Sequence, residues 1–447
     1  MNDIALRSIA SLAPLALALC AVPATAHAAE FTVNSTSDQH DISPGDGICR
    51  VWGRLPTCTL RAAIEEANAL AGTDVIRLGA GHYTLTQGEL EASSSLTIQG
   101  TDDPVIDANG ASRVLHVDGD GAAINVRLYD LTVTGGSEWY PGGCIDVWPS
   151  SRLHVMRSVV EGCSSTQMGS GIASWGYVRI YRSSIRDNGN IGSQDGGGVT
   201  ATGGGIFSAY TGTLDIESSA IVGNHAPRGG GIASAGALTV SDSTISGNTS
   251  LSYGAGVLVL QADASTADID RCTITENEVG YSDNEGTTGG AGIMAFDYVR
   301  IHATILAGNV HTWHPLDEPD APDCRVGGVG VIESAGYNFI GDATPCGIDL
   351  DDSDMAGDDD DVLDPELGPL VAWTSGGTEV HIPQSGSPVI HAGPRCQISS
   401  IPNTPIPNCY LVDQRGYSRA NGDSIYIDIG AYETDGYLRR YIPGPLF

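Results

Sequence analysis

The chain has 447 residues, with 54 acidic and 21 basic side chains and a net charge of −33 at pH 7 when histidine is neutral. So acidic a chain repels the phosphates of nucleic acid, which excludes nucleic acid as an expected partner, and it disfavours polyanionic substrates unless a divalent cation bridges them. The 59 glycines, the charged fraction of 17% and short runs of Thr, Ser, Val and Ile are typical of an all-β protein.

Residues 1–28 are predicted to be a cleavable secretory signal. Arg7 precedes the apolar run LAPLALALCAV, and Ala26 and Ala28 form a small-residue cleavage site after it. The run is too short to span a bilayer, and no later segment is long enough either. We therefore expect an extracellular or cell-surface protein without a transmembrane segment. Attachment of a lipid to Cys20 is an alternative that the bulky Leu19 before it disfavours.

Residues 29–90 are predicted to close the N-terminal end of the fold. Within CTLRAAIEEANALAG, residues 58–72, five apolar residues recur at helical spacing: Leu60, Ala63, Ile64, Ala67 and Leu70. Glu65 and Glu66 lie off this stripe, and we expect them to face water. The pattern predicts a short amphipathic helix over residues 59–70. The segments VIRLGAGHYTLT and SLTIQG that follow are predicted to form the first strands.

From about residue 142 the chain repeats one phrase, and residues 91–345 are predicted to form a solenoid. Six segments, from GGCIDVWPSSRLHVMRSVVEGC to GAGIMAFDYVRIHATILAGN, open with two or three glycines and a branched apolar residue. A leucine-rich repeat would show L-x-x-L-x-L, which is missing, and a β-sandwich would not repeat the phrase. The predicted fold is all-β, a right-handed parallel β-helix solenoid with a short N-terminal capping helix.

Most repeats end in an asparagine, and these residues are expected to occupy the same corner of successive coils. Each side-chain amide can then bond to its counterpart one coil away, which predicts an internal ladder. The residues are Asn188, Asn224, Asn248, Asn277 and Asn309, with Cys163 in the equivalent position of the first segment. The connecting loops 189–202, 278–288 and 310–322 vary in length and are expected to carry variable function.

Nine cysteines remain after removal of the signal, and in an oxidising compartment neighbours in sequence are expected to pair. The predicted disulfides are Cys49–Cys58, Cys144–Cys163, Cys324–Cys346 and Cys396–Cys409. Cys272 is left over. Because it lies within a repeat, we interpret it as a small buried side chain and not as a reactive thiol. The spacings lack C-x-x-C, so a structural zinc site is not expected.

A polysaccharide lyase or glycoside hydrolase would need carboxylates that converge on one sheet beside a base, and the chain has no lysine to serve as that base. Three arginines alternate along one segment: Arg179, Arg182 and Arg186. No carboxylate cluster in adjoining coils pairs with them, so we interpret them as outward, solvated residues. Three carboxylates recur at comparable places and are interpreted as an outward polar ladder: Asp215, Asp242 and Asp270.

The acidic stretch DLDDSDMAGDDDDVLD, residues 349–364, is the best candidate for an ion site. Dense carboxylate oxygens suit Ca²⁺, although the spacing is not that of an EF-hand. The candidate calcium ligands are Asp349, Asp351, Asp352, Asp354, Asp358 and Asp360. A solvated acidic loop is the alternative. In HTWH, His311 and His314 could bind a metal, but an exposed loop is favoured.

Two segments resemble those of a known family of exported bacterial β-helix proteins. Cys58 to Ala69 is similar to the "CSLREA" segment, with Thr59 and Ala62 in place of the usual Ser and Glu. LGPLVAWTSGGTEVHIPQSGSPVIHAG, DQRGYSR and DIGAYE resemble the "choice-of-anchor" region, with His391 where Asp is usual. The resemblance implies a pectin-lyase-like β-helix, and residues 346–447 are then an acidic loop and a C-terminal cap region.

The sequence leaves two classes of function open. The favoured one, which the resemblance implies, is a non-catalytic surface or adhesive scaffold whose partner is an extracellular polysaccharide or a cell-surface ligand. The alternative is a carbohydrate-active enzyme, a polysaccharide lyase or glycoside hydrolase, acting in a groove of the β-helix. Convergent carboxylates and an arginine on one sheet would favour the enzyme, and a uniform Thr/Ser/Asn surface would favour the scaffold.

Overall fold

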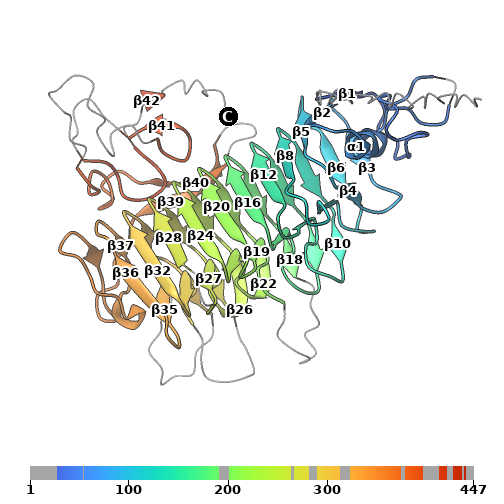
Figure 1. The fold of residues 1–447 in the computed structure, drawn as a ribbon. Helices are drawn as coiled ribbons and strands as arrows, with labels where there is room; N and C mark the ends of the chain where they lie inside the picture. Colours follow the sequence, from blue (N-terminus) through green and yellow to red (C-terminus); the bar gives the residue numbers. More distant parts are fainter. Residues whose placement is uncertain are drawn as a thin grey trace, which may run out of the picture.

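The computed structural model describes residues 28–53, 55–190, 201–262, 266–280, 289–312, 323–373, 378–395, 412–419, 426–434 and 437–438. Most of the predicted signal, the Cys396–Cys409 pair, His314 and much of the three predicted loops lie outside these residues. The described chain is a right-handed parallel β-helix, as predicted. Its coils stack side by side from the N-terminal end to the orange coils at the far end (Figure 1).

Four parallel sheets, here named A to D, form the walls of the solenoid. Sheet A contains β1 (Glu30–Val33), β2 (Asp74–Leu78), β5 (Leu96–Gly100), β8 (Asn125–Tyr129), β12 (Arg152–Met156), β16 (Tyr177–Tyr181), β20 (Thr213–Glu217), β24 (Ala237–Ser241), β28 (Thr266–Asp270), β32 (Tyr298–His302) and β36 (Val331–Ser334). Sheet B contains β3 (His82–Thr84), β6 (Val105–Asp107), β9 (Thr132–Thr134), β13 (Val159–Glu161), β17 (Ser184–Arg186), β21 (Ala220–Val222), β25 (Thr244–Ser246), β29 (Thr273–Thr275), β33 (Ile305–Leu306), β37 (Phe339–Ile340) and β38 (Met355–Ala356).

The other two sheets complete each coil. Sheet C contains β4 (Leu90–Ala92), β7 (Leu115–Val117), β11 (Ile145–Val147), β15 (Ile172–Ser174), β19 (Ile206–Ser208), β23 (Ile232–Ser234), β27 (Val257–Val259), β31 (Ile293–Ala295) and β35 (Cys324–Val326). Sheet D contains β10 (Ser137–Glu138), β14 (Ser164–Ser165), β18 (Gly189–Asn190), β22 (His225–Arg228), β26 (Thr249–Tyr253), β30 (Glu278–Val279) and β34 (Val310–His311). In the repeats the chain therefore runs through sheets C, A, B and D and then enters the next coil.

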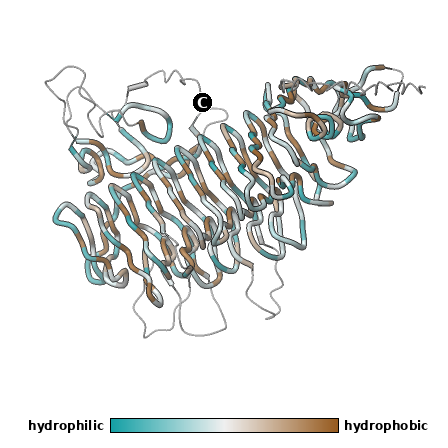
Figure 2. Tube along the Cα trace, viewed as in Figure 1, coloured by the Kyte–Doolittle hydropathy of each residue, from teal (hydrophilic) through white to brown (hydrophobic). Residues whose placement is uncertain are grey.

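Stacking in register builds the core. In sheet A, Val155 pairs with Ile180 and Ile180 with Ile216, and all three side chains are fully buried. Hydrophobic residues recur in every coil of the solenoid (Figure 2), and those of the strand interiors are buried. Because strand side chains alternate between the two faces, the residues between them point outward. The outer faces of the sheets are therefore where function can lie.

Asparagine and hydroxyl side chains hold the corners of the coils together. The predicted asparagine ladder is confirmed: Nδ2 of Asn188 donates to Oδ1 of Asn224 at 3.0 Å, and the same bond links each later pair. The ladder ends on Asp323, which accepts from Asn309 at 2.9 Å. A second ladder, here called the hydroxyl ladder, was not predicted from the sequence. It runs through Ser158, Ser183, Ser219, Ser243, Cys272, Thr304 and Asn338. Cys272 is fully buried within it and free, in agreement with its interpretation as a structural thiol.

The N-terminal helix α1 (Leu60–Ala69) covers the first coil, as predicted. Thr59 caps it by accepting a hydrogen bond from the amide of Ala62, and Ile64 is buried. The expectation that Glu66 faces water is wrong. Its carboxylate is buried because the preceding turn folds over the helix, so that the amides of Gly45 and Gly47 donate to it. The disulfides Cys49–Cys58, Cys144–Cys163 and Cys324–Cys346 are formed.

The C-terminal part lies along the side of the solenoid and not across its end (Figure 1). After the short helix η1 (Thr344–Cys346), it contains the antiparallel pairs β39 (Leu367–Ala372) with β40 (Glu379–Pro383) and β41 (Tyr417–Ser418) with β42 (Tyr437–Leu438). We call residues 378–395, 412–419 and 426–434 the flank segments. They lie against five coils of sheet B and its adjoining corners, and their hydrogen bonds run from Glu379 with Ser184 at 2.7 Å to Gly430 with Ala303 at 2.9 Å. No helix among the described residues is long and apolar enough to cross a membrane.

Candidate functional site

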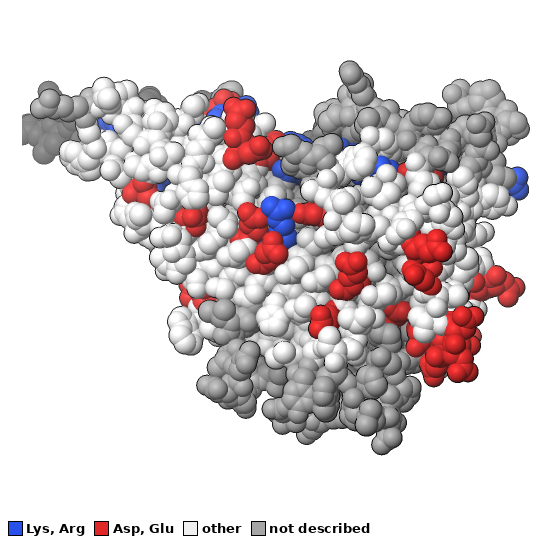
Figure 3. Space-filling model, turned by 180° about the vertical axis from the view of Figure 1, so that it is seen from behind, with Lys and Arg blue, Asp and Glu red and all other residues white. Residues whose placement is uncertain are grey.

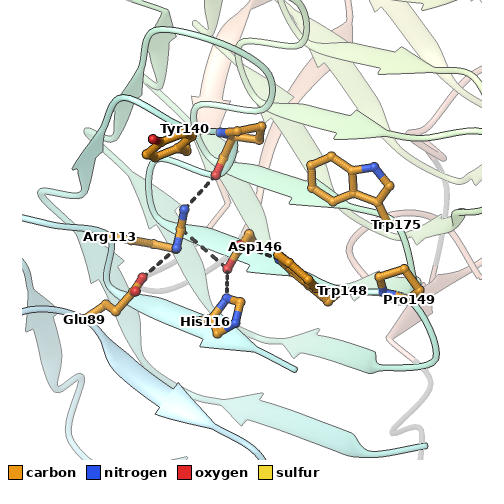
Figure 4. Close-up of a pocket in the computed structure, with 9 residues that line it drawn as sticks. Glu89, Arg113, His116, Tyr140, Asp146, Trp148, Pro149 and Trp175 are labelled. Carbon is orange, nitrogen blue, oxygen red and sulfur yellow. Dashed lines mark hydrogen bonds and ion pairs between the residues drawn. The ribbon is translucent and has the colours of Figure 1, made fainter. Parts of the chain in front are cut away.

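A pocket of about 530 Å³ opens on the outer side of sheet C, over β4, β7, β11 and β15 (Figure 4). Its lining combines charged residues with aromatic and proline rings: Glu89, Arg113, His116, Tyr140, Pro141, Asp146, Trp148, Pro149 and Trp175. From β19 to β31 the outward row of sheet C is apolar, with Phe207, Ala233, Leu258 and Met294 in one cluster. The pocket is therefore a chemically distinct stretch of the sheet.

Asp146 organises the polar floor of the pocket. It is the central residue of β11, in register with His116 of β7, and neighbouring strands lie about 4.8 Å apart. Its Oδ1 bonds Nδ1 of His116 at 2.7 Å, and its Oδ2 accepts from Nε1 of Trp148 at 3.1 Å. Asp146 is almost fully buried. Its hydrogen bond is the main cause that raises the pKa of His116 above the ordinary value, against the opposing effect of burial.

Arg113 fixes the neighbouring carboxylate. Its Nη1 donates to Oε2 of Glu89 at 2.6 Å, while Nε and Nη2 donate to the carbonyls of Gly142 and Pro141 at 2.8 and 2.9 Å. Nε also lies 3.5 Å from Asp146. The buried guanidinium thus holds Glu89, the turn before β11 and Asp146 in one arrangement (Figure 4).

Two indoles and a tyrosine form the wall of the pocket. The amides of Trp148 and Trp175 bond Val117 and Val147 in the coil before each, so the two indoles occupy the same position in successive coils. Trp148 and Tyr140 remain 48% and 66% exposed, which leaves their rings open to a ligand. Large exposed aromatic surface with nearby polar groups is typical of a recognition site.

The chemistry available in the pocket is narrow. Both carboxylates already accept from protein donors, Asp146 from His116 and Trp148 and Glu89 from Arg113. Because Nδ1 of His116 faces Asp146, Nε2 is the ring nitrogen left for a ligand. The described lining holds no Ser, Thr or Cys that could act as a nucleophile. The arrangement can bind a polar ring by stacking and hydrogen bonding, and His116 is its one candidate acid or base.

Arg179 and Arg186 lie at outward, partly exposed strand positions, as predicted. The prediction that no carboxylates in adjoining coils pair with the three arginines is wrong. Arg179 donates to Glu217 at 2.6 Å, one coil onward. Arg186 donates to Glu161 one coil back and to Glu379 of the flank segments, both at 2.7 Å. Arg182 lies at a turn against the ring of Tyr181. The pairs within the solenoid depend on the register between coils, and the pair with Glu379 was missed because the flank segments could not be placed from the sequence.

The three aspartates do not form one outward ladder, so that prediction is also wrong. Asp215 is in register with Arg179 and Thr239. Asp242 lies at a turn, is buried, and accepts from Arg271 and Arg419. Asp270 is the last residue of β28, beside His302 at 2.7 Å. Coils of unequal length make similar positions in sequence differ in register.

The predicted calcium ligands are spread along the last coil. Asp354 accepts from the side chain of Asn338 at 3.0 Å and so continues the hydroxyl ladder, while Asp351 and Asp358 accept from nearby groups of their own turns. Nowhere in the described ranges do three His, Cys, Asp or Glu side chains gather in a way that could hold a metal ion. His311 lies on β34. Calcium binding stays a prediction, which titration with Ca²⁺ followed by thermal unfolding can test.

The sequence analysis missed the pocket, although one signal was present. In the repeated phrase, the residue after the branched apolar position is small or apolar in five segments and charged only at Asp146 of GGCIDVW. A charged residue within an apolar row, followed by tryptophan, marks an exception to the repeat. Glu89, Arg113 and His116 could not be found in this way because their coils precede the clear repeats.

Seen from behind the view of Figure 1, the molecule carries several groups of acidic side chains and few basic ones, in keeping with the net charge (Figure 3). The polar and aromatic pocket therefore belongs to a molecule that is acidic overall.

A comparison with family models agrees with the fold. A family model described as "Right handed beta helix region" matches residues 114–305. Among solved structures, the chain is similar to that of "Crystal structure of pectate lyase Pel9A", with 13% identity, coverage of 92% of this chain and 97% of that chain, and a TM-score of 0.41. Nothing about activity follows from so weak a likeness. No curated protein matches the sequence.

Proposed function

We propose that the protein is an exported, non-catalytic β-helix scaffold that binds a sugar unit of an extracellular polysaccharide in the pocket on sheet C. The observation that carries the proposal is the pair of indoles, Trp148 and Trp175, at equivalent positions of two coils above a polar floor. A sugar ring has apolar faces that stack on aromatic rings and hydroxyls that hydrogen bond at its edge. Glu89 and His116 supply polar groups at that edge.

Binding fits the geometry better than hydrolysis. A glycoside hydrolase uses two carboxyl groups, one to protonate the leaving group and one as base or nucleophile. Here Asp146 is buried beneath His116 and Trp148, and Glu89 is paired with Arg113. Asp146 is thus shielded from a substrate, and the described lining offers no second unpaired carboxylate.

Export is part of the proposal and is supported by two observations. The N-terminal segment has the pattern of a secretory signal. Three disulfides are formed within the described chain, and disulfides persist in oxidising compartments outside the cytosol.

Binding to a panel of neutral and acidic polysaccharides, followed by calorimetry on the best one, tests the proposal. Trp148→Ala and Trp175→Ala are expected to weaken binding at least about tenfold each, because stacking area is lost. Trp52→Ala is the matched control, since Trp52 is 86% exposed and does not line the pocket. If no polysaccharide binds, or if both pocket variants bind like the wild type, the proposal is wrong.

A carbohydrate-active enzyme is the second candidate, and His116 is the observation that favours it. A histidine held by a carboxylate can act as a general base. An assay for chain cleavage on the same panel, with and without Ca²⁺, tests this. Cleavage that is abolished by His116→Ala would establish the enzyme, and the absence of cleavage on every polymer would leave binding alone.

A further inference from the structure

A row of basic side chains crosses the outer face of sheet A. Arg127 of β8, His154 of β12 and Arg179 of β16 are direct register partners. All three lie at outward positions of their strands, and Arg152 begins β12 beside them. Like charges on neighbouring strands destabilise a sheet. A cluster of arginines in a chain with a net charge of −33 therefore calls for an explanation.

The charges of this row are only partly neutralised within the protein. Arg179 is paired with Glu217 at 2.6 Å and lies 3.8 Å from Asp215. Within the described part of the chain, the guanidinium groups of Arg127 and Arg152 have no carboxylate partner, and Arg152 lies 5.7 Å from the ring centre of Tyr177. Two guanidinium groups are thus available to an external anion.

His154 lies between these arginines and is sensitive to their charge. Burial, followed by the charges of Arg127, Arg179 and Arg152, lowers the pKa of His154 to about 4, so the ring is neutral at physiological pH. Its ring packs near Tyr177, with the centroids 5.8 Å apart. A bound anion would oppose the repulsion from the arginines and raise this pKa.

The basic row and the pocket belong to the same coils. Trp148 lines the pocket just before the chain turns into β12, which begins at Arg152. Trp175 lines it just before β16, which begins at Tyr177. The two sites therefore flank one corner between sheets C and A, and a polymer held in the pocket can continue around that corner onto the row.

We propose that the polysaccharide is acidic, and that Arg127 and Arg152 bind carboxylates of sugar units next to the one in the pocket. The inference rests on the proposed function and names the class of its ligand. Guanidinium groups bind carboxylates through paired, charge-assisted hydrogen bonds. The net charge alone disfavours a polyanion. At physiological salt, however, charges farther than about 8–10 Å from the ligand are screened, so the arginines next to the ligand determine whether it is attracted. No bridging cation is then required.

Binding of polygalacturonate and of its fully methyl-esterified, neutral form tests the inference. The wild type is expected to bind the charged polymer at least about tenfold more tightly at low salt, and the difference should shrink as salt is added. In Arg127→Gln/Arg152→Gln the difference should vanish while binding of the ester is unchanged, and Arg127→Lys/Arg152→Lys should restore part of it. Arg300→Gln is the control, because Arg300 lies in the same row of the sheet but is paired with Asp268 at 2.9 Å.

The outcomes separate this inference from the proposed function. Equal binding of the charged and esterified polymers by the wild type would overturn the inference that the ligand is acidic, and it would leave the proposal of sugar binding in the pocket standing. If Trp148→Ala loses binding of the ester while the arginine variants bind both polymers like the wild type, the pocket is supported as the sugar site. The role of Arg127 and Arg152 is then overturned. NMR titration of His154 gives a second readout: oligogalacturonate should raise its pKa in the wild type, and an unchanged value overturns the inference.

Discussion

Arg419 donates from Nη2 to Oδ1 of Asp242 at 3.0 Å, which joins two positions 177 residues apart in sequence. Nε of Arg419 reaches the same oxygen at 3.2 Å, and Arg271 donates to both carboxylate oxygens of Asp242. All three side chains are buried. The carboxylate of Asp242 thus pairs with one arginine of the neighbouring coil and one of the flank segments.

Arg419→Ala is expected to destabilise the protein by about 3–5 kcal/mol, because it removes one partner of a buried charge and leaves a cavity. Arg419→Met keeps most of the volume and should cost less. Chemical denaturation measures both, and limited proteolysis should show cleavage of the flank segments first. Unchanged unfolding of both variants would show that this contact does not anchor the flank segments.

Ionisation of the buried Glu433 carboxyl should lower the free energy of unfolding as the pH rises. Burial, and then the charge of Asp428, raises the pKa of Glu433 from 4.5 to about 8. Between these values the folded state holds a proton that the unfolded state has lost, so the stability present at low pH is lost as the pH rises through the folded pKa. Glu433→Gln should be more stable than the wild type at about pH 9, by roughly 2–4 kcal/mol, and equal to it at about pH 4. Parallel pH profiles of the free energy of unfolding would contradict this.

Asn248→Ala should destabilise the solenoid by about 3 kcal/mol. Its side chain donates to Asn277 and Ile221 and accepts from Asn224, all in a buried position, and the variant leaves those partners unsatisfied. Thr213→Ala, at an exposed position of sheet A, is the control and should change the free energy of unfolding by less than about 0.5 kcal/mol. Similar values for both variants would mean that the ladder contributes no stability.

Ile64→Asp tests the helical cap. Ile64 is 1% exposed on the side of α1 that covers the first coil, and a carboxylate there has no partner. We expect a loss of several kcal/mol, about 3–5, with a matching fall in the thermal midpoint. Ala69→Asp, at an exposed position of the same helix, controls for the added charge. An unchanged midpoint for Ile64→Asp would rule out the cap.

Cys272 should be unreactive in the folded protein. Its side chain is fully buried, and burial raises the pKa of the thiol well above the ordinary value, so little thiolate forms. Thiol counting should find it only after denaturation. Rapid modification of the native protein at this residue would contradict its place in the hydroxyl ladder.

The sequence predicted those parts of the fold that repeat or are local. The asparagine ladder followed from one residue type at one corner, and α1 from apolar spacing within a single helix. Three disulfides followed from neighbouring cysteines. Contacts between distant segments escaped prediction, because nothing periodic links Asp242 with Arg419 or Glu379 with Ser184. The pocket escaped because His116 and Asp146 meet through register, which the irregular early coils conceal.

The course of the flank segments changes how the solenoid bears load. In a stack whose coils contact only their neighbours, a force at one end can peel the coils away one at a time. The flank segments bond to successive coils of sheet B from Ser184 to Ala303. Separating two of these coils must then break the contacts of the flank segments on one side of the gap, as well as the contacts between the coils. The flank segments therefore carry part of a force that acts along the solenoid, and their contacts with sheet B are loaded in shear.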